Sequence, residues 1–275
     1  MDIQAIIVTF NSGHIIDKCL AALQAQGVSA IVVDNASSDN TLEVAASFGA
    51  KTIENGENLG FGVANNIGAS AASAEYLLFL NPDIEIDESI KNLAAAVKNY
   101  PDFGMIAPKI VEDDGRVFLQ PRSLLSPANL NVKSMPLPNG DACYPFLSGA
   151  CFLMRKAVFE KLGGFDKNIF LFYEDDDLCR RLWDAKLPLI HCDGWQAKHG
   201  RGKSSKPNPD NIYKVRYHMA YSRAYVARKY GIKTKPLADV VKFALKYTLS
   251  ILSFNQATMA RYNGSLMGTL DGMKH

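Results

Sequence analysis

Four consecutive acids form the part of the chain with the clearest capacity for chemistry. The run Glu174 to Asp177 follows the aromatic run Phe170 to Tyr173 and opens a helical pattern. Neighbouring carboxylates repel one another, so a fold keeps four together only where solvent, a helix N-terminus, a cation or a reaction uses them. Acids in the first turn also complement a helix dipole, which leaves a purely structural role open. The apolar run before them places these acids at the end of a buried segment, which favours a functional role.

Further polar side chains follow three of the predicted strands. Thr9 and Asn11 come at the end of the first strand, Asp34 ends the second, and Asn81 and Asp83 follow the fourth. Residues of these types are common in loops and caps, so each one alone is a weak signal. Because the carboxyl ends of parallel strands meet at one edge of a sheet, the three groups together predict a ligand site at that edge.

Alternating strands and helices must position these groups. We predict strands over residues 3–9, 30–33, 51–53 and 75–80, and helices over residues 14–26, 41–48, 63–72 and 87–99. This alternation specifies an α/β fold with a doubly wound, mostly parallel sheet. With 275 residues and 48% hydrophobic content, we expect one large α/β domain, alone or with an appendage.

The charge distribution is uneven, although the net charge is only +2. Residues 1–100 hold twelve acids and four bases, whereas residues 198–235 hold eleven bases against Asp210 alone. Such a basic segment favours an anionic partner. Because no helix-turn-helix, zinc-finger or aromatic RNA-binding signature accompanies it, we expect the phosphates of a small ligand or an anionic membrane, and no nucleic acid.

The five cysteines are scattered and never spaced Cys-x-x-Cys, which argues against a disulfide framework and against a zinc site. The first residues enter a strand-like run without the basic and apolar regions of a signal peptide. We therefore expect a cytoplasmic protein.

Two other nucleotide-binding classes fit poorly. The segment 60–65 has Asn65 where a dinucleotide fingerprint has its third glycine, and it does not follow the first strand. The segment 9–13 lacks the Lys-bearing, Gly-rich loop of a P-loop enzyme.

Eight ordered segments resemble the family 2 glycosyltransferases, and within them the bacterial rhamnosyltransferase-like branch. They are Ile6-Ile-Val-Thr-Phe-Asn11, residues 32–41, residues 58–66, Phe79-Leu-Asn-Pro-Asp83, residues 148–155, residues 163–166, Glu174-Asp-Asp-Asp177 and His199-Gly-Arg-Gly-Lys-Ser204. The tail 260–268 also resembles the end of such enzymes. The resemblance implies a GT-A fold, a divalent metal and inverting transfer of a sugar from a nucleotide diphosphate.

The resemblance also implies a division of the chain. We expect a GT-A catalytic domain over residues 1–210, made of a nucleotide-binding half (1–100) and an acceptor and catalytic half (101–210). A helical C-terminal extension is then expected over residues 211–275.

The metal assignment also follows from the resemblance. Asp83 holds the second position of the family's Asp-x-Asp motif, while Asn81 replaces the first acid. His199 matches the C-terminal His motif and is expected to complete the site, although a lone His is more often structural. Mg²⁺ or Mn²⁺ held by carboxylate oxygen would neutralise the charge that develops on a diphosphate leaving group.

Residues at or near the ends of the predicted strands are expected to bind the nucleotide. Asp34 matches the acid that reads the pyrimidine base, and Thr9, Asn11, Asn58 and Asn81 are expected to contact the nucleotide. A carboxylate that accepts the imide N–H selects uracil or thymine over cytosine, which lacks that donor. We therefore expect a UDP- or dTDP-sugar.

The four acids are expected to divide the catalytic work. The resemblance places the base that deprotonates the acceptor hydroxyl at Asp175. In a helix Glu174 and Asp177 lie three residues apart on one face, and we assign them to the sugar or acceptor. Neighbouring Asp176 stays open as an alternative base.

Two further groups complete the expected site. Gly149 and Ala150 lack bulk and would let the backbone approach the sugar, with tight packing in a turn as the alternative. Arg201 and Lys203 lie on a Gly-rich loop that would close over the diphosphate, with a solvated basic loop as the alternative.

Residues 236–254 predict an amphipathic helix. Lys242 and Lys246 near its middle exclude a membrane-spanning helix. The helix is expected either to lie in the interface of an anionic membrane or to pack on the catalytic domain or in a homodimer, and the sequence leaves these open.

The sequence thus predicts an inverting, metal-dependent glycosyltransferase. The branch resemblance implies transfer of L-rhamnose from dTDP-rhamnose to a glycan or lipid-linked glycan in cell-surface polysaccharide synthesis. Another UDP- or dTDP-sugar is the alternative donor. A degenerate homologue that binds nucleotide or glycan without catalysis is the alternative from a different class, and the presence of the acids Asp34, Asp83, Asp175 and Asp177 favours the enzyme.

Overall fold

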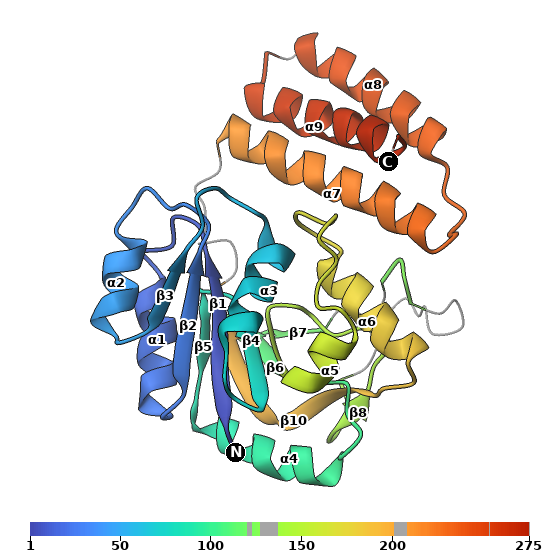
Figure 1. The fold of residues 1–275 in the computed structure, drawn as a ribbon. Helices are drawn as coiled ribbons and strands as arrows, with labels where there is room; N and C mark the ends of the chain where they lie inside the picture. Colours follow the sequence, from blue (N-terminus) through green and yellow to red (C-terminus); the bar gives the residue numbers. More distant parts are fainter. Residues whose placement is uncertain (120–122, 127–136, 201–207, 253, 275) are drawn as a thin grey trace.

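The computed structural model describes residues 1–119, 123–126, 137–200, 208–252 and 254–274. One mixed sheet lies between two layers of helices, and three C-terminal helices lie beyond the carboxyl edge of that sheet (Figure 1). Within these residues, no helix combines the length and the apolar character needed to cross a membrane.

The first half of the chain alternates strands and helices as predicted. Its elements are β1 (Ile3–Thr9), α1 (Ile16–Ala25), β2 (Ser29–Asp34), α2 (Thr41–Ser47), β3 (Lys51–Glu54), α3 (Phe61–Ala71), β4 (Tyr76–Leu80), β5 (Ile84–Ile86), the 3-10 helix η1 (Glu88–Asn92) and α4 (Leu93–Asn99). The single helix expected over residues 87–99 is therefore wrong in part, since its first turns are a 3-10 helix. Asp87 caps that helix by accepting a hydrogen bond from the Ser89 N–H.

The second half supplies the remaining strands and the C-terminal helices. These elements are β6 (Met105–Glu112), β7 (Val117–Phe118), β8 (Ala142–Cys143), β9 (Cys151–Arg155), α5 (Lys156–Lys161), α6 (Glu174–Asp184), β10 (Leu189–His199), α7 (Pro209–Lys229), α8 (Pro236–Leu252) and α9 (Gln256–Gly272).

The strands form one sheet in the order β3-β2-β1-β4-β9-β6-β10-β5, with β7 beside β6 and β8 beside β10. β1 pairs in parallel with β2 and β4, and β2 pairs in parallel with β3. β9 runs antiparallel to β4 and β6 and so joins this group to the parallel pair β6 and β10. The expected α/β fold with a mostly parallel sheet is confirmed, and the ends of β1, β2, β4 and β10 lie at one edge.

The core has one layer on each face of the sheet. Apolar side chains of α1, α2 and α4 cover one face, and those of α3, α5 and α6 cover the other. Both faces of the central strands are buried, which is why β4 is apolar along its whole length.

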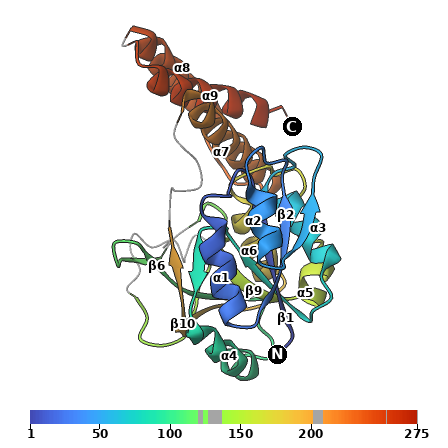
Figure 2. The ribbon, with the colours of Figure 1, turned by 90° about the vertical axis from the view of Figure 1, so that its left-hand side faces the viewer.

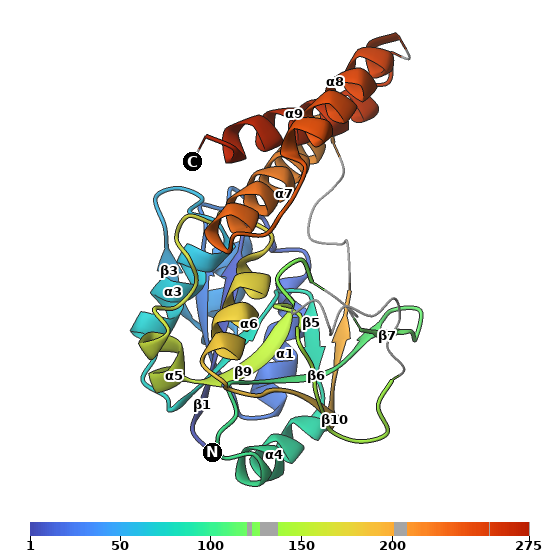
Figure 3. The ribbon, with the colours of Figure 1, turned by 90° about the vertical axis from the view of Figure 1, so that its right-hand side faces the viewer.

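The C-terminal helices stack on one another and on the α/β part of the chain, and α8 lies farthest from the sheet (Figures 2 and 3). α9 meets α7 through Gly264, Gly268 and Gly272, where an added Cβ would stand 2.4, 2.1 and 2.7 Å from backbone carbonyl oxygens of α7. Only glycine allows two helices to approach this closely.

α7 rests on the segment that leads into the four acids. Ser222 donates a hydrogen bond to the Leu171 carbonyl at 3.0 Å. The rings of Phe170 and His218 stack with their centroids 4.2 Å apart. The C-terminal helices therefore help to fix the position of the acidic helix.

Candidate active site

A cleft of about 390 Å³ opens where β1, β4 and β10 end. Five of the residues predicted from the sequence line it, namely Thr9, Asn58, Asn81, Asp83 and His199. Several other lining residues were not predicted from the sequence, among them Phe10, Asn35 and Phe170. Asn35 follows Asp34 directly in the segment 32–41, so its place in that motif was the available signal.

Asp83 and His199 face one another inside this cleft. The distance from His199 Nε2 to Asp83 Oδ1 is 3.4 Å, and both side chains are almost buried. Backbone pairing holds them together, since the Gly200 N–H donates to the Asp83 carbonyl at 3.0 Å and His199 lies opposite Ile84 in the sheet. The sequence separates these residues by more than one hundred positions, and the antiparallel pairing of β5 with β10 brings them together.

This pair fits a divalent cation. Neighbouring ligands of a six-coordinate Mg²⁺ or Mn²⁺ stand roughly 3 Å apart, close to the observed spacing of the two donor atoms. The other ring nitrogen of His199, Nδ1, is buried and has no hydrogen-bond partner within the described residues. Within the described residues, no three His, Cys, Asp or Glu side chains are placed so that they could hold one metal ion together, so further ligands would be oxygens of the diphosphate, water or the Asn81 amide.

Asp34 is fully buried at the end of β2 and forms a compact hydrogen-bond network. Its carboxylate accepts hydrogen bonds from Thr9 Oγ1 at 2.7 Å, from the Ser37 N–H at 2.8 Å and from Ser37 Oγ at 2.5 Å. The side chain therefore orders the loop after β2 and does not line the cleft. Its expected contact with the base stays a prediction.

Asn11 and Asn58 also bond to loops at this edge. Asn11 has a left-handed backbone, with φ of 53°, and its side-chain oxygen accepts a hydrogen bond from the Ser38 N–H at 2.8 Å. Asn58 accepts from the Gly60 N–H at 3.0 Å. Of these two residues, Asn58 lines the cleft and Asn11 does not.

Gly60 joins the nucleotide side of the cleft to the segment before the acids. It has a φ of +84°, and an added Cβ would stand 2.4 Å from the Phe170 carbonyl oxygen. The next residue, Phe61, donates its N–H to that same carbonyl at 3.0 Å. A side chain at residue 60 would break this junction.

The acidic helix begins after an unusual turn. Phe172 and Tyr173 both have positive φ angles, 66° and 69°. Left-handed backbone in two consecutive aromatic residues is strained, and such strain is found mainly at functional sites. The turn directs the first residues of α6 towards the loop before β9.

Asp175 meets Gly149 at this point, so the structure brings two of the predicted residues together. The Gly149 N–H donates to Asp175 Oδ2 at 2.9 Å. The next residue, Ala150, accepts a hydrogen bond from the Asn81 N–H at 2.9 Å. Asp175 is thus connected through two adjacent backbone groups to the loop that carries Asp83.

The other acids have different surroundings. Asp177 is fully buried and accepts from Arg181 Nε at 2.8 Å, Lys229 Nζ at 2.5 Å and the Tyr230 hydroxyl at 2.8 Å. These contacts use its carboxylate to hold α7 against α6, a role that was not predicted from the sequence. Asp176 accepts a hydrogen bond from the Ser123 hydroxyl.

Burial raises the pKa values of three acids in the first turn of α6. Desolvation raises the pKa of Asp175, although hydrogen bonds from Gly149 and Asp176 oppose the rise. The pKa values of Glu174 and Asp176 are raised by burial and by the neighbouring Asp175 charge. Glu174 Oε2 is buried without a hydrogen-bond partner within the described residues. A carboxylate with a raised pKa is suited to general base catalysis.

Two expected diphosphate contacts, Arg201 and Lys203, lie outside the described residues. Their assignment stays a prediction.

Comparisons with known proteins identify the family. The family model for glycosyl transferase family 2 matches residues 4–163, which is more than half of the chain. The chain is 26% identical over 250 residues to an N-acetylglucosaminyl-diphospho-decaprenol L-rhamnosyltransferase of Mycobacterium tuberculosis, covering 78% of this chain and 81% of the relative. It is 25% identical over 288 residues to the dTDP-rhamnosyl transferase RfbF of Shigella flexneri, covering 99% and 96% of the two chains.

A solved structure shows the same fold. A mannosyltransferase from Pyrobaculum calidifontis, in complex with GDP-Man and Mn²⁺, matches with a TM-score of 0.59 and 14% identity, covering 98% of this chain and 86% of that one. The fold is therefore of the GT-A type, as expected. Taken with the family match and the rhamnosyltransferase relatives, these findings show that the chain is a glycosyltransferase of family 2 and belongs to its rhamnosyltransferase-like branch.

Proposed function

We propose that this enzyme transfers L-rhamnose from dTDP-rhamnose, with inversion, to a lipid-linked glycan during cell-surface polysaccharide synthesis. The observation that carries the proposal is the connection between the Asp83–His199 pair and Asp175 through Asn81, Ala150 and Gly149. The rhamnosyl donor and the lipid-linked acceptor rest on the names of the two relatives.

The donor side of the site lies in the strand-end cleft. Thr9, Asn58 and Asn81 line it and supply hydroxyl and amide groups for the nucleotide. Asp83 and His199 would hold Mg²⁺ or Mn²⁺, which when bound offsets the negative charge that develops on the diphosphate leaving group.

The acceptor side is organised by Asp175. Its carboxylate takes the proton of the acceptor hydroxyl as the hydroxyl oxygen attacks the anomeric carbon, and the bond from that carbon to the diphosphate breaks on the opposite face. The Gly149 N–H holds Oδ2 at 2.9 Å and the Asp176 N–H holds Oδ1 at 2.9 Å, so both carboxylate oxygens are oriented. Each oxygen keeps a further lone pair for the acceptor hydroxyl. The raised pKa of Asp175 makes its carboxylate a stronger base.

We also propose that α8 lies against an anionic membrane. Leu237, Val241, Leu245, Leu249 and Leu252 on its outer side are 60 to 73% exposed. Lys242 and Lys246 are exposed on the same helix, and Asp239, its one acid, pairs with Arg223 at 2.8 Å. An apolar stripe flanked by cations suits an interfacial helix.

The exposed apolar side chains of α8 could instead form a homodimer contact, and substitution of three of them distinguishes the dimer from the membrane. Changing Val241, Leu245 and Leu249 to Gln should abolish binding to phosphatidylglycerol vesicles without changing the solution mass. A halved mass in that variant would assign the stripe to a dimer instead.

A hydrolysis screen of sugar nucleotides tests the proposed reaction. With Mg²⁺ or Mn²⁺ and no acceptor, the enzyme should release dTDP slowly from dTDP-rhamnose and faster than it hydrolyses UDP-sugars. Preferred hydrolysis of a UDP-sugar would change the donor assignment. Absence of hydrolysis for every donor, with nucleotide binding retained, would support a degenerate binding homologue.

A further inference from the structure

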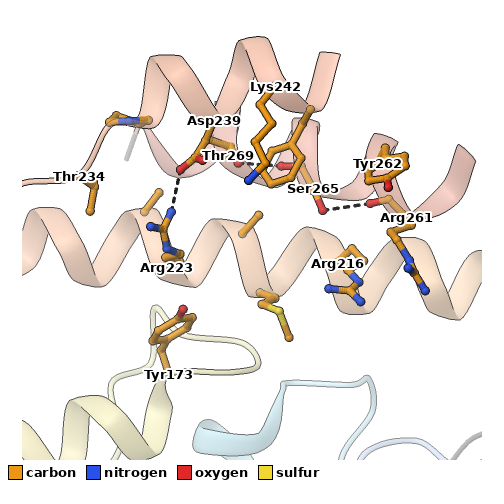
Figure 4. Close-up of a pocket in the computed structure, with 15 residues that line it drawn as sticks. Tyr173, Arg216, Arg223, Thr234, Asp239, Lys242, Arg261, Tyr262, Ser265 and Thr269 are labelled. Carbon is orange, nitrogen blue, oxygen red and sulfur yellow. Dashed lines mark hydrogen bonds and ion pairs between the residues drawn. The ribbon is translucent and has the colours of Figure 1, made fainter. Parts of the chain in front are cut away.

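A second cavity, of about 330 Å³, lies among the three C-terminal helices and reaches the start of the acidic helix. Figure 4 shows Tyr173 on one side of α7, and Lys242, Tyr262 and Ser265 of α8 and α9 on the other side. None of its lining residues lines the strand-end cleft, so the two sites are separate.

The lining is strongly cationic. It includes Arg216, Arg223, Lys242 and Arg261, while Asp239 is the one acid among the lining residues. Arg223 is neutralised by Asp239 at 2.8 Å. The other three cations have no ion-pair partner anywhere in the described part of the chain. Uncompensated arginines in a cavity favour a phosphate-bearing anion, because the guanidinium matches phosphate oxygens in charge and shape.

The position of the cavity relates it to the reaction. Tyr173 lines it and immediately precedes α6, so the cavity begins two residues from Asp175 in the chain. At the other end, α8 contributes Lys242 to the lining while Val241 and Leu245 are exposed on the outer side of the helix. The cavity thus lies between the acidic helix and the surface that we assign to the membrane.

We propose that this cavity binds the diphosphate of the lipid-linked acceptor and thereby orients the acceptor sugar towards Asp175. The inference rests on the proposed function and adds a second phosphate site to it. The sugar passes Tyr173 towards the base, and the lipid chain follows the apolar side of α8 into the bilayer. This arrangement keeps the acceptor diphosphate apart from the donor diphosphate at Asp83 and His199.

Direct binding tests the proposal without relying on turnover. The probe is geranyl diphosphate, titrated by calorimetry in excess chelator so that a metal in the strand-end cleft cannot hold it. The test variant carries Arg216→Gln and Arg261→Gln. The matched control carries Lys214→Gln and Lys233→Gln, which removes the same charge from exposed positions outside the cavity.

We expect the wild type and the control variant to bind geranyl diphosphate within about twofold of each other. The cavity variant should bind at least about tenfold more weakly, the effect of losing one charge-assisted contact. No binding by the wild type, or equal weakening in both variants, would overturn the proposal.

Binding to phosphatidylglycerol vesicles tests whether the cavity binds the phosphate of a membrane lipid headgroup instead of the acceptor diphosphate. Both double variants should lose vesicle binding to the same extent, because only overall charge matters there. Selective loss of vesicle binding in the cavity variant, with geranyl diphosphate binding intact, would make the cavity a headgroup site instead.

Donor hydrolysis without acceptor separates this inference from the proposed function. The cavity variant should hydrolyse the donor as fast as the wild type, which also shows that it is folded. A wild type that hydrolyses no sugar nucleotide would contradict the proposed function while leaving the binding result to decide the cavity.

Discussion

The Gly149 N–H donates to Asp175 Oδ2 at 2.9 Å, and a Cβ added to Gly149 would stand 2.9 Å from Asp175 Cβ. The loop before β9 and the acidic helix therefore touch at a point where no side chain fits. This contact orients the Asp175 carboxylate, one of the four in the acidic run. Glycine is needed at residue 149 because the two segments approach closely there, and not because of an unusual φ angle.

Gly149→Ala should therefore reduce transfer while donor binding is retained. The added methyl group displaces Asp175, and a small displacement of a catalytic group costs on the order of 10²-fold in rate. Initial rates of transfer and calorimetric donor affinity measure the two effects. Gly56→Ala is the matched control, because nothing lies within 4 Å of its added Cβ. Equal activity of the two variants would contradict the role of this contact.

Asp83→Ala should abolish activity and weaken metal-dependent nucleotide binding while leaving the fold intact. Asp83 supplies the carboxylate that faces His199 at 3.4 Å, and the imidazole alone is a poor ligand for Mg²⁺. Glu85→Ala removes an exposed carboxylate two residues away and should change neither property. Full activity of Asp83→Ala, or of the wild type in excess chelator, would exclude the metal role.

Asp176→Asn should stabilise the protein at neutral pH. The pKa of Asp176 is raised in the folded state, so the folded protein binds more protons than the unfolded chain above the ordinary pKa of an Asp. Asp176 therefore lowers the free energy of unfolding of the wild type as pH rises from about 4 to about 9. Urea unfolding at pH 5 and pH 8 should show a larger gain for the variant at pH 8. A gain independent of pH would show that the carboxyl proton is not the cause.

Asp177→Asn should destabilise the protein. Breaking a buried ion pair costs about 3–5 kcal/mol, because the Lys229 and Arg181 cations lose their fully buried partner. Asp184→Asn breaks an exposed pair with Arg180 on the same helix and should cost under about 1 kcal/mol. Thermal or urea unfolding compares the two variants, and similar losses would contradict a structural role for Asp177.

The sequence predicted the first strand of the sheet better than the elements that depend on long-range contacts. The strand over residues 3–9 matches β1, because a buried parallel strand is a continuous apolar run. The antiparallel β9 was not predicted, since strand direction depends on long-range pairing that a local pattern does not carry. The helix over 87–99 failed in its first turns for a similar reason. There Ser89 bonds to the Gln196 backbone at 2.8 Å, a contact that spans 107 residues.

The site shows the same division. The family motifs singled out Asp83 and Asp175 as site residues. The burial of Asp34 and the ion pairs of Asp177 were not predicted, because they depend on contacts with distant parts of the chain. Helical spacing put Glu174 and Asp177 on one face, but it does not show that Lys229 and Tyr230, at the C-terminal end of α7, donate hydrogen bonds to Asp177. Likewise, amphipathic spacing predicted the helix over 236–254, while the exposure of Val241 and Leu245 depends on how α8 packs against α9.

Transfer by Asp175→Asn, compared with Asp176→Asn, tests the central claim most directly. Asn keeps the shape and hydrogen bonding of Asp but cannot take the acceptor proton, so Asp175→Asn should lower the transfer rate by roughly 10²–10⁴-fold with donor affinity nearly unchanged. Asp176→Asn should retain near-normal turnover. Near-normal turnover in Asp175→Asn, together with loss in Asp176→Asn, would contradict the account and move the base to Asp176.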